Sequence, residues 1–442
     1  MFVFSGEVPL LRNLPPRIGV DGFNLALPRG TGVATYARTL TYCLKAMGCD
    51  VDVVYGMNIS RRTPAALREV MFFDSLDQES AGRLPKPLTL RWWRDCGADM
   101  IGHAAIDVPI SGRVEMRGFV HRMPAFDRVL NVPNLYRVAA RYFQYSGRLL
   151  TINIPNPPNI MHWTYPLPLR LKGARNIYTI HDLVPLRLPQ TTLDNKDYYF
   201  RLIRKLAQQA DALCTVSEAS RSEILSFFPD VSERLYNTYQ SFQPSGSTEG
   251  PHGDDFAQQI EGLFDLRPGE FFLFFGSLEP KKNIGRLIES FLMARTDYPL
   301  VIVGAMAWKS EAELRFLGRG VATGRIRQLE YLPMPLLMAL IRGSRAVVFP
   351  SLSEGFGLPV LEALSFGTPV LTSREGALPE VAGEAALYVD AYDTSSITAG
   401  IEELDGSDAL RAKLRDLGPQ QAARFNMSIY EDRLWKMYEA VL

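Results

Sequence analysis

The chain has 442 residues, of which 47% are hydrophobic and 22% are charged. This length exceeds what one hydrophobic core accommodates, and the composition is that of a folded globular protein, which excludes a disordered chain. Lysine plus arginine and aspartate plus glutamate are equal at 48 each, so the charge does not indicate a nucleic-acid partner. No run of about 18 apolar residues occurs, so we expect no membrane-spanning helix.

The cysteines and the first residues bear on the cellular compartment. Four cysteines occur without metal-ligand spacing, and we expect them to be reduced core residues: Cys43, Cys49, Cys96 and Cys214. The opening residues, MFVFSGEVPLLRNLPPR, lack the positive region and long apolar run of a signal peptide. Both observations predict a cytoplasmic protein.

Short apolar runs alternate with amphipathic helical stretches from Arg17 onward, a pattern typical of parallel sheets covered by helices. In the first half, the predicted strands are Arg17–Asp21, Val51–Tyr55, Asn176–Ile180 and Ala212–Thr215, and the predicted helices are Val33–Met47, Tyr198–Ala210 and Ser217–Phe228. Between about Leu88 and Leu150 the periodicity is broken, and no element is predicted there.

A polar stretch rich in glycine, proline and serine, between Gln243 and Phe256, is the predicted linker. The alternation then resumes with strands Phe271–Phe275, Leu300–Val303, Ala346–Pro350 and Pro369–Leu371, and with helices Ile284–Ala294, Pro335–Arg342, Leu358–Phe366 and Met427–Leu442. The sequence therefore predicts an α/β fold with two doubly wound domains, at residues 1–245 and 254–426.

The segment EGFGLPVLE, from Glu354 to Glu362, carries the most chemical information. A predicted strand leads into a glycine-containing loop, and Pro359 stands in the first turn of the next helix, where its missing N–H costs nothing. The helix start offers backbone N–H groups and a positive dipole end to an anion. Both carboxylates are placed to face a ligand that lies across this helix start.

This segment resembles the Glu-x7-Glu signature of glycosyltransferase family 4, a large retaining family with the GT-B fold, in which two Rossmann-like domains face each other across a cleft. The resemblance implies that Glu354 acts in catalysis and that Glu362 binds the ribose of a nucleotide-sugar donor. It assigns the adjoining segment to the donor sugar and phosphate: Gly355, Phe356, Gly357 and Leu358. It also implies that helix 427–442 crosses back to the N-terminal domain.

The segment FFGSLEPKKN places a lysine pair after the strand that ends at Gly276. A fixed cation beside a departing diphosphate lowers the barrier to bond cleavage. The family has a lysine just before asparagine, which matches Lys282 as a catalytic residue. Many relatives carry arginine directly after the glycine, where this chain has Ser277, so Lys281, a backbone amide or Lys282 alone completes the phosphate contact. The structural alternative is a solvated lysine turn.

Two further segments belong to the predicted site. His181-Asp182 ends a predicted strand and resembles the family's TIHDL segment, which implies that His181 lies beside the donor sugar in catalysis; a purely structural histidine is the alternative. The glycine loop Gly30, Thr31 and Gly32 precedes a helix and is predicted to close over the diphosphate. Because Thr35 replaces a third glycine, a dinucleotide-binding dehydrogenase is disfavoured.

Three smaller assignments follow from the same reasoning. Ser217 is predicted as the N-cap of its helix, and Glu380 as a carboxylate at a helix start. The segment HWTYPLPLR, from His162 to Arg170, is also similar to bacterial polysaccharide members of the family. Its aromatic residues are predicted to line the acceptor site.

The resemblance implies a retaining hexosyltransferase that needs no metal and no cofactor beyond its substrate. We identify no Asp-x-Asp motif of the kind that holds a divalent ion on a nucleotide sugar. The segments GSLEPKKN and TIHDLVPLRLP are most similar to those of bacterial mannosyltransferases that use GDP-mannose. This similarity implies transfer of mannose from GDP-mannose to a glycan or lipid-linked saccharide in bacterial surface polysaccharide synthesis. GDP-fucose, dTDP-rhamnose and UDP-hexose donors stay open. A non-catalytic subunit that binds sugar nucleotides or glycans also stays open.

Residues 111–150 contain seven arginines against two acidic residues, a local charge of 7 − 2 = +5, interleaved with aromatic residues. Such a segment suits an anionic membrane surface, which predicts a peripheral protein at the inner face of the cell membrane. The alternative is a surface insertion whose arginines pair with acidic groups and whose aromatic residues fill the core.

Overall fold

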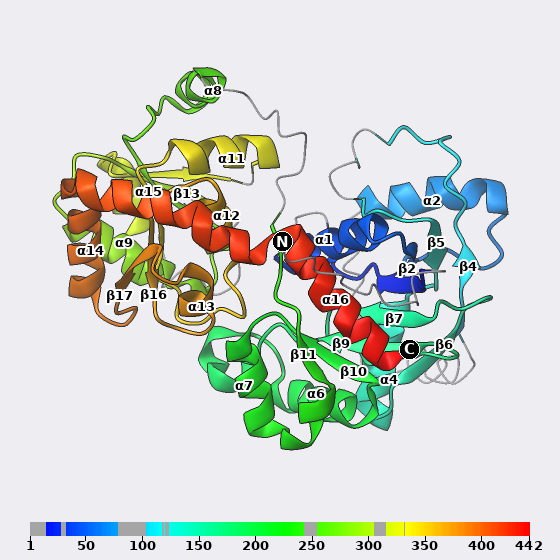
Figure 1. Cartoon of the computed structure of the whole chain (residues 1–442). Coiled ribbons are helices and arrows are strands. Elements are labelled where there is room, and N and C mark those ends of the chain that lie inside the picture. Colours follow the sequence, from blue (N-terminus) through cyan, green and yellow to red (C-terminus); the bar gives the residue numbers. More distant parts are fainter. Residues whose placement is uncertain are drawn as a thin grey trace, which may run out of the picture. The chain divides into compact units, whose positions relative to one another are not determined.

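The structure is a computed structural model, and it describes residues 15–27, 32–77, 103–116, 119, 123–242, 254–304, 315–330 and 332–442 (Figure 1). The chain forms two compact units. The first comprises Met1–Thr179, Leu202–Ala212 and Trp435–Leu442, and the second comprises Ile180–Arg201 and Leu213–Leu434. These limits differ from the predicted domains 1–245 and 254–426, which stay a prediction; most of the predicted linker lies outside the described residues.

The first sheet has eight strands in the order β11-β10-β9-β7-β1-β2-β5-β4. Their bounds are β1 Arg17–Asp21, β2 Asp50–Tyr55, β4 Ile106–Asp107, β5 Arg128–Asn131, β7 Ile160–Trp163, β9 Arg175–Thr179, β10 Ala212–Thr215 and β11 Leu235–Asn237. β1 pairs parallel with both β2 and β7, whereas the short β4 runs antiparallel to β5. A second, three-stranded sheet holds β3 His103–Ala104, β6 Leu150–Asn153 and β8 Leu169–Leu171.

Helices alternate with these strands along the chain. They are α1 Gly32–Ala46, α2 Ala65–Asp77, α4 Leu135–Ser146, α5 Val184–Arg187, α6 Lys196–Gln209 and α7 Glu218–Phe227. β1 and β7 are almost wholly buried because helices cover parallel sheets on both faces, which explains their continuous apolar runs.

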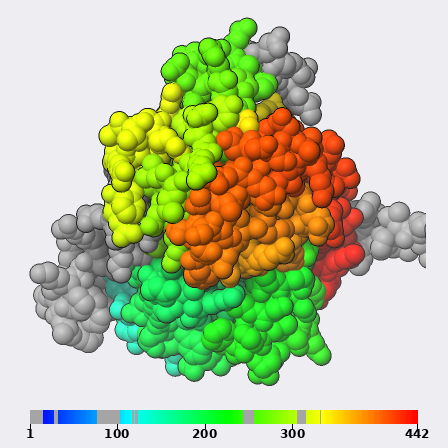
Figure 2. All heavy atoms as spheres, turned by 90° about the vertical axis from the view of Figure 1, so that its left-hand side faces the viewer, coloured from blue at the N-terminus to red at the C-terminus, as the bar shows by residue number. Residues whose placement is uncertain are grey.

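The third sheet has six strands in the order β14-β13-β12-β15-β16-β17, and each neighbouring pair is parallel. The strands are β12 Phe272–Phe275, β13 Leu300–Val303, β14 Ile326–Leu329, β15 Ala346–Phe349, β16 Val370–Ser373 and β17 Ala386–Val389. The helices are α8 Asp254–Phe264, α9 Ile284–Met293, α10 Leu317–Ala322, α11 Met334–Gly343, α12 Leu358–Ser365, α13 Leu378–Ala382, α14 Thr394–Gly406, α15 Asp408–Ala422 and α16 Met427–Val441. Figure 2 shows α14 and α15, in orange, forming much of one outer face.

The α/β fold class is confirmed, and all the predicted strands and helices occur within two residues of their predicted ends. The elements that were not predicted include the short β3 to β8 and α4, in and around the stretch with broken periodicity. Strands of two to four residues carry too few side chains for an alternation to be recognised. The three described cysteines, Cys43, Cys49 and Cys214, are buried and free, as expected.

A buried chain of hydrogen bonds runs from α16 through the first sheet to α1. The hydroxyl of Tyr438 lies 2.7 Å from Nδ1 of His162, whose Nε2 lies 2.8 Å from the Thr179 hydroxyl. That hydroxyl is 2.9 Å from the hydroxyl of Tyr36. The end of α16 thus belongs to the first unit through a fully satisfied polar contact in its core.

The prediction that the His162–Arg170 segment lines an acceptor site is wrong for its first residues. His162 and Trp163 are fully buried in β7. The Trp163 indole donates to the Asn176 side chain at 3.1 Å and stacks on Tyr178. These aromatic residues serve the core of the sheet.

Several members of the arginine-rich segment are engaged inside the first unit. Arg128 forms an ion pair with the buried Asp52 at 2.6 Å, and Arg141 is buried. The ring of Phe143 lies in the core, and the Tyr136 hydroxyl donates to the carbonyl of Val54. These contacts favour the alternative of a surface insertion. Arg117 and Arg122 lie outside the described residues. Among the described helices, none is long and apolar enough to cross a membrane.

We expect Tyr438→Phe to destabilise the protein, because it leaves the buried imidazole of His162 without one hydrogen-bond partner. An unsatisfied buried polar group costs about 1–3 kcal/mol, which corresponds to a fall of several degrees in Tm. Thermal unfolding followed by circular dichroism measures this. Tyr42→Phe on α1, where the side chain is 51% exposed, is the matched control and should leave Tm unchanged. Equal Tm values for the two variants would contradict a stabilising role of the buried chain.

Candidate active site

The segment that carries the Glu-x7-Glu signature connects β15 to α12 in the second unit. Gly357 is the N-cap of α12 and has φ = 100°, in the left-handed region. A Cβ at this position would lie 2.8 Å from Cδ2 of Leu378, so both the backbone conformation and the packing favour glycine. Pro359 occupies the first turn of the helix, as the sequence predicts. The loop therefore packs closely against α13 and leads directly into the first turn of α12.

The backbone N–H groups at this helix start form a donor array. Among the described residues, the N–H groups of Gly355, Phe356, Gly357 and Leu358 find no acceptor, although all four residues are buried. Buried N–H groups almost always have a partner, and unpaired ones at a helix N-terminus suit an anionic ligand. These are the amides predicted to bind the donor.

Lys282 forms an ion pair with Glu354, the residue that directly precedes this array in the chain. The Lys282 Nζ lies 2.6 Å and 2.9 Å from the two carboxylate oxygens of Glu354. Their side chains are only 12% and 7% exposed, so water screens the pair weakly. The same Nζ lies 5.1 Å from the ring centroid of Phe349 at the end of β15. The lysine predicted to neutralise a departing phosphate is thus fixed in place by the first signature glutamate.

Glu362, the second signature glutamate, differs from the first in having no partner among the residues that the structure describes. It lies in α12, is 7% exposed, and has no hydrogen bond or ion pair with any described residue. Burial without a compensating partner raises the pKa of this carboxyl group to about 8. A buried carboxyl group with open acceptor positions suits a diol that donates two hydrogen bonds, as a ribose does.

His181 lies against the signature loop through its backbone. The carbonyl oxygen of His181 approaches Gly355 so closely that a Cβ at Gly355 would lie 2.3 Å from it. The next residue, Asp182, faces Lys281, whose Nζ lies 3.8 Å from Oδ2. The second unit therefore brings together His181, Glu354 and Lys282, the three residues predicted to be catalytic.

The residues predicted around the β12 loop have distinct environments. Gly276 has φ = 137°, and a Cβ at Gly304 would lie 1.9 Å from its carbonyl oxygen, so two glycines allow β12 and β13 to end side by side. The Ser277 hydroxyl donates to Glu279 at 2.6 Å. Gly30 and Thr31 of the N-terminal glycine loop lie outside the described residues, whereas Gly32 is the exposed first residue of α1.

Asn283 was not predicted as part of the site. Its side-chain amide donates to the carbonyls of Pro350, at 2.9 Å, and Ala391, at 2.7 Å, and it is 1% exposed. It also adopts a left-handed conformation, with φ = 61°, which asparagine tolerates better than most residues. This residue joins the lysine loop to the loop of Glu354. The sequence shows only that an asparagine follows the lysine pair. The hydrogen-bond partners of Asn283 in the structure show that it connects the two loops.

The predicted capping residues also occur. The Ser217 hydroxyl accepts from the N–H of Ser220 at 3.0 Å and caps α7. The Glu380 carboxylate lies in the first turn of α13, as predicted, and also accepts from the N–H groups of Glu218 and Ala219 at the start of α7. Both residues therefore stabilise the start of α7.

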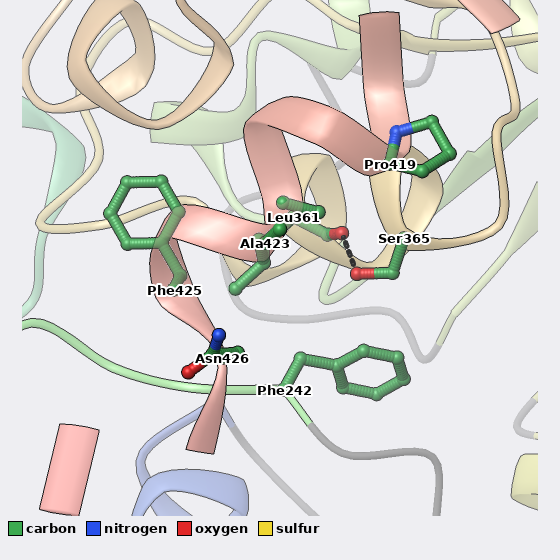
Figure 3. A pocket seen from close by; sticks show the side chains of 8 residues that line it. Phe242, Leu361, Ser365, Pro419, Ala423, Phe425 and Asn426 are labelled. Atoms are coloured by element: carbon green, nitrogen blue, oxygen red, sulfur yellow. Dashed lines mark hydrogen bonds between the residues drawn. The ribbon is translucent and has the colours of Figure 1, made fainter. Parts of the chain in front are cut away.

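A cavity of about 220 Å³ adjoins α12 at Leu361 and Ser365 (Figure 3). Its other lining residues come from the segment at Phe242 and from the end of α15 onward: Pro419, Ala422, Ala423, Phe425 and Asn426. The Ser365 hydroxyl donates to the carbonyl of Leu361 at 2.7 Å. Because no charged side chain lines this cavity, it does not suit a diphosphate, and the donor is not assigned to it.

Comparison with known proteins agrees with this arrangement. Residues 263–421 match the family model described as glycosyl transferases group 1, and residues 31–235 match a glycosyl transferase 4-like domain. The O-antigen chain mannosyltransferase B of Escherichia coli is 32% identical over 265 residues, which cover 59% of this chain and 68% of the relative. The serotype-specific mannosyltransferase WbdA of Escherichia coli is 28% identical over 60% of this chain, and the match spans only 33% of WbdA.

Solved structures show the same fold at low identity. Sucrose-phosphate synthase from Thermosynechococcus elongatus superimposes with a TM-score of 0.64 at 16% identity, covering 96% of this chain and 99% of that one. Anabaena HepE, solved in complex with UDP and glucose, gives 0.64 at 12% identity, covering 96% and 100%. Together, the sequence matches, the fold and the Glu-x7-Glu segment show that this chain is a glycosyltransferase of family 4 with the GT-B fold.

Proposed function

We propose that this glycosyltransferase transfers mannose from GDP-mannose, with retention of configuration, to a hydroxyl group of a glycan or lipid-linked saccharide in bacterial surface polysaccharide synthesis. The main support for a donor site is the ion pair of Lys282 and Glu354. It lies beside the four amides of residues 355–358, which have no acceptor among the described residues. A cation, a carboxylate and a helix start are the groups that a diphosphate attached to a sugar requires.

In this proposal, the helix start and Lys282 bind the diphosphate, and Glu362 accepts hydrogen bonds from the ribose. The bond between the anomeric carbon and the phosphate oxygen breaks while the acceptor oxygen bonds to the same face of that carbon. The acceptor proton passes to the departing phosphate oxygen. Lys282 compensates the negative charge that grows on this phosphate, and the protein acts by positioning and charge stabilisation. No metal or further cofactor enters the proposal.

The identity of the sugar rests on the relatives. The Escherichia coli relatives are named as mannosyltransferases, and one is named for the O-antigen chain. GDP-fucose, dTDP-rhamnose and UDP-hexose are the alternative donors. Attachment to an anionic membrane surface also remains a proposal, supported by the exposed Arg113, Arg148 and Tyr145.

A thermal-shift panel of GDP, UDP and dTDP and their sugars tests the donor, because a ligand raises Tm according to its affinity. We expect GDP and GDP-mannose to give the largest shifts. Release of GDP from GDP-mannose in the presence of octyl α-mannoside then measures transfer. Binding without release for every donor and acceptor would favour a non-catalytic subunit, whereas a larger shift with UDP or dTDP sugars would exclude GDP-mannose.

We expect Lys282→Ala to lower kcat by about 100-fold, the usual order for losing one group that stabilises transition-state charge. The affinity for GDP should fall less, because the phosphate charge grows only as the bond breaks. The substitution also leaves the carboxylate of Glu354 unpaired, so Lys282→Arg, which keeps a cation, is the control. Turnover of Lys282→Ala near that of the wild type would contradict the assignment of Lys282.

At pH 9, where Glu362 is ionised, we expect Glu362→Gln to weaken GDP binding by about 10- to 100-fold, which corresponds to the loss of hydrogen bonds to a charged acceptor. Isothermal titration calorimetry measures this. The wild-type affinity should rise with pH up to about 8, the pKa that burial gives Glu362, because the ionised carboxylate is the better acceptor. In the variant, this contribution should be absent; an unchanged pH profile would contradict the assignment.

The same substitution should affect stability without ligand. The raised pKa of Glu362 means that the folded protein retains a proton that the unfolded chain loses above its ordinary pKa. Stability contributed by this group is therefore present at low pH and is lost as the pH rises through about 8. Glu362→Gln should raise Tm relative to the wild type at pH 9 but not at pH 4.

A further inference from the structure

One serine in α7 connects two segments of the candidate site. The hydroxyl of Ser220 lies 2.8 Å from the carbonyl oxygen of His181 and 3.2 Å from the carbonyl oxygen of Gly355. Ser220 is 3% exposed, so water does not readily replace it. His181 and Gly355 belong to the two segments assigned to the donor sugar.

This contact has one hydrogen-bond donor and two acceptors. A serine hydroxyl has one proton, and both neighbours are carbonyl acceptors, so the single donor is shared between them. Two carbonyl dipoles that approach in a buried place repel each other unless a donor lies between them. The hydroxyl of Ser220 therefore compensates the close approach that the absence of a side chain at Gly355 makes possible.

The position of Ser220 is fixed independently of the two carbonyls. Its own N–H donates to the Ser217 hydroxyl, the N-cap of α7. The N–H groups of Glu218 and Ala219, which lie at the same helix start, donate to the Glu380 carboxylate. Since α7 is anchored through these bonds, its first turn acts as a fixed support for the segments that Ser220 contacts.

Other bonds hold each of the two segments separately. The Tyr199 hydroxyl donates to the carbonyl of Asp182 at 2.9 Å, and the Asp182 side chain accepts from the N–H of Val184. On the other side, the carbonyl of Glu354 accepts from the N–H of Ala377 at 3.0 Å. The Ser220 hydroxyl, in contrast, joins one segment to the other.

We propose that Ser220 is a positioning residue for glycosyl transfer: its hydroxyl sets the spacing between the His181 carbonyl and the loop of Glu354 and Gly355. The inference rests on the proposed function in placing both segments beside the donor sugar. The Ser220 hydroxyl reaches the amide array of residues 355–358 at its first residue, through the Gly355 carbonyl, and has no bond to Lys282 or Glu362 among the described residues. Loss of this hydroxyl should therefore disturb the sugar end of the site more than nucleotide binding.

The test compares Ser220→Ala with the wild type, using GDP release from GDP-mannose with octyl α-mannoside as acceptor. We expect kcat to fall about 10- to 100-fold, the range for a misplacement of the reacting groups by about 1 Å. The Kd for GDP should stay within about twofold of the wild type, because Ser220 has no bond to Lys282 or Glu362, the side chains assigned to the diphosphate and the ribose. Ser220→Thr, which keeps a hydroxyl, should recover part of kcat.

Ser290→Ala is the matched control. Ser290 is equally buried, and its hydroxyl donates to a backbone carbonyl, that of Thr394, away from the site. It should lose stability like Ser220→Ala but keep its kcat. The proposal is overturned if kcat of Ser220→Ala stays within about twofold of the wild type, if Ser290→Ala loses as much, or if the GDP affinity falls in parallel with kcat.

Hydrogen exchange separates this proposal from the choice of donor. In Ser220→Ala without ligand, peptides that cover residues 180–187 and 352–358 should exchange faster than in the wild type, and those of Ser290→Ala should not. This readout does not depend on which nucleotide sugar the enzyme uses. Faster exchange in both peptides would support the role of Ser220 even if GDP-mannose proved to be the wrong donor, and unchanged exchange would refute it.

Discussion

The ion pair between Lys282 and Glu354 joins two loops that follow neighbouring parallel strands, β12 and β15. A buried charge is costly alone, so each of these side chains requires the other, and the two loops are held together. Asn283 strengthens the same junction from the next position, and the carbonyl of Lys281 accepts from the N–H of Leu352 at 2.8 Å. The cation for a phosphate and the helix start for an anion therefore lie side by side before any ligand is bound.

The remaining polar groups of the site are left uncompensated. The amides of residues 355–358 and the carboxyl group of Glu362 have no partner among the described residues, although they are buried. Each unsatisfied group lowers the stability of the empty protein, and in the proposed function a nucleotide sugar would satisfy them together. Lys282, paired with Glu354, fixes the geometry of the site, whereas Glu362 has acceptor positions that the proposal assigns to the ribose.

The first unit uses similar residues for a different purpose. His162, Thr179, Tyr36 and Tyr438 form a buried chain in which each hydroxyl or ring nitrogen finds a partner, and this chain anchors the end of α16. Trp163 and Arg128 are likewise engaged internally, by Asn176 and Asp52. Aromatic and basic residues near a motif are therefore weak evidence for a binding surface, because a folded core satisfies them equally well.

The sequence alone determined the α/β class and most strand and helix positions, because apolar periodicity and the glycine and proline signals act locally along the chain. Through their resemblance to motifs of the family, it also indicated Glu354, Glu362, Lys282 and His181. Only the tertiary structure decided that Lys282 pairs with Glu354, that Glu362 stays unpaired, and that Ser220 lies between two carbonyls. These outcomes depend on which distant segments meet and on how much water they exclude, and neither quantity is encoded in local sequence spacing.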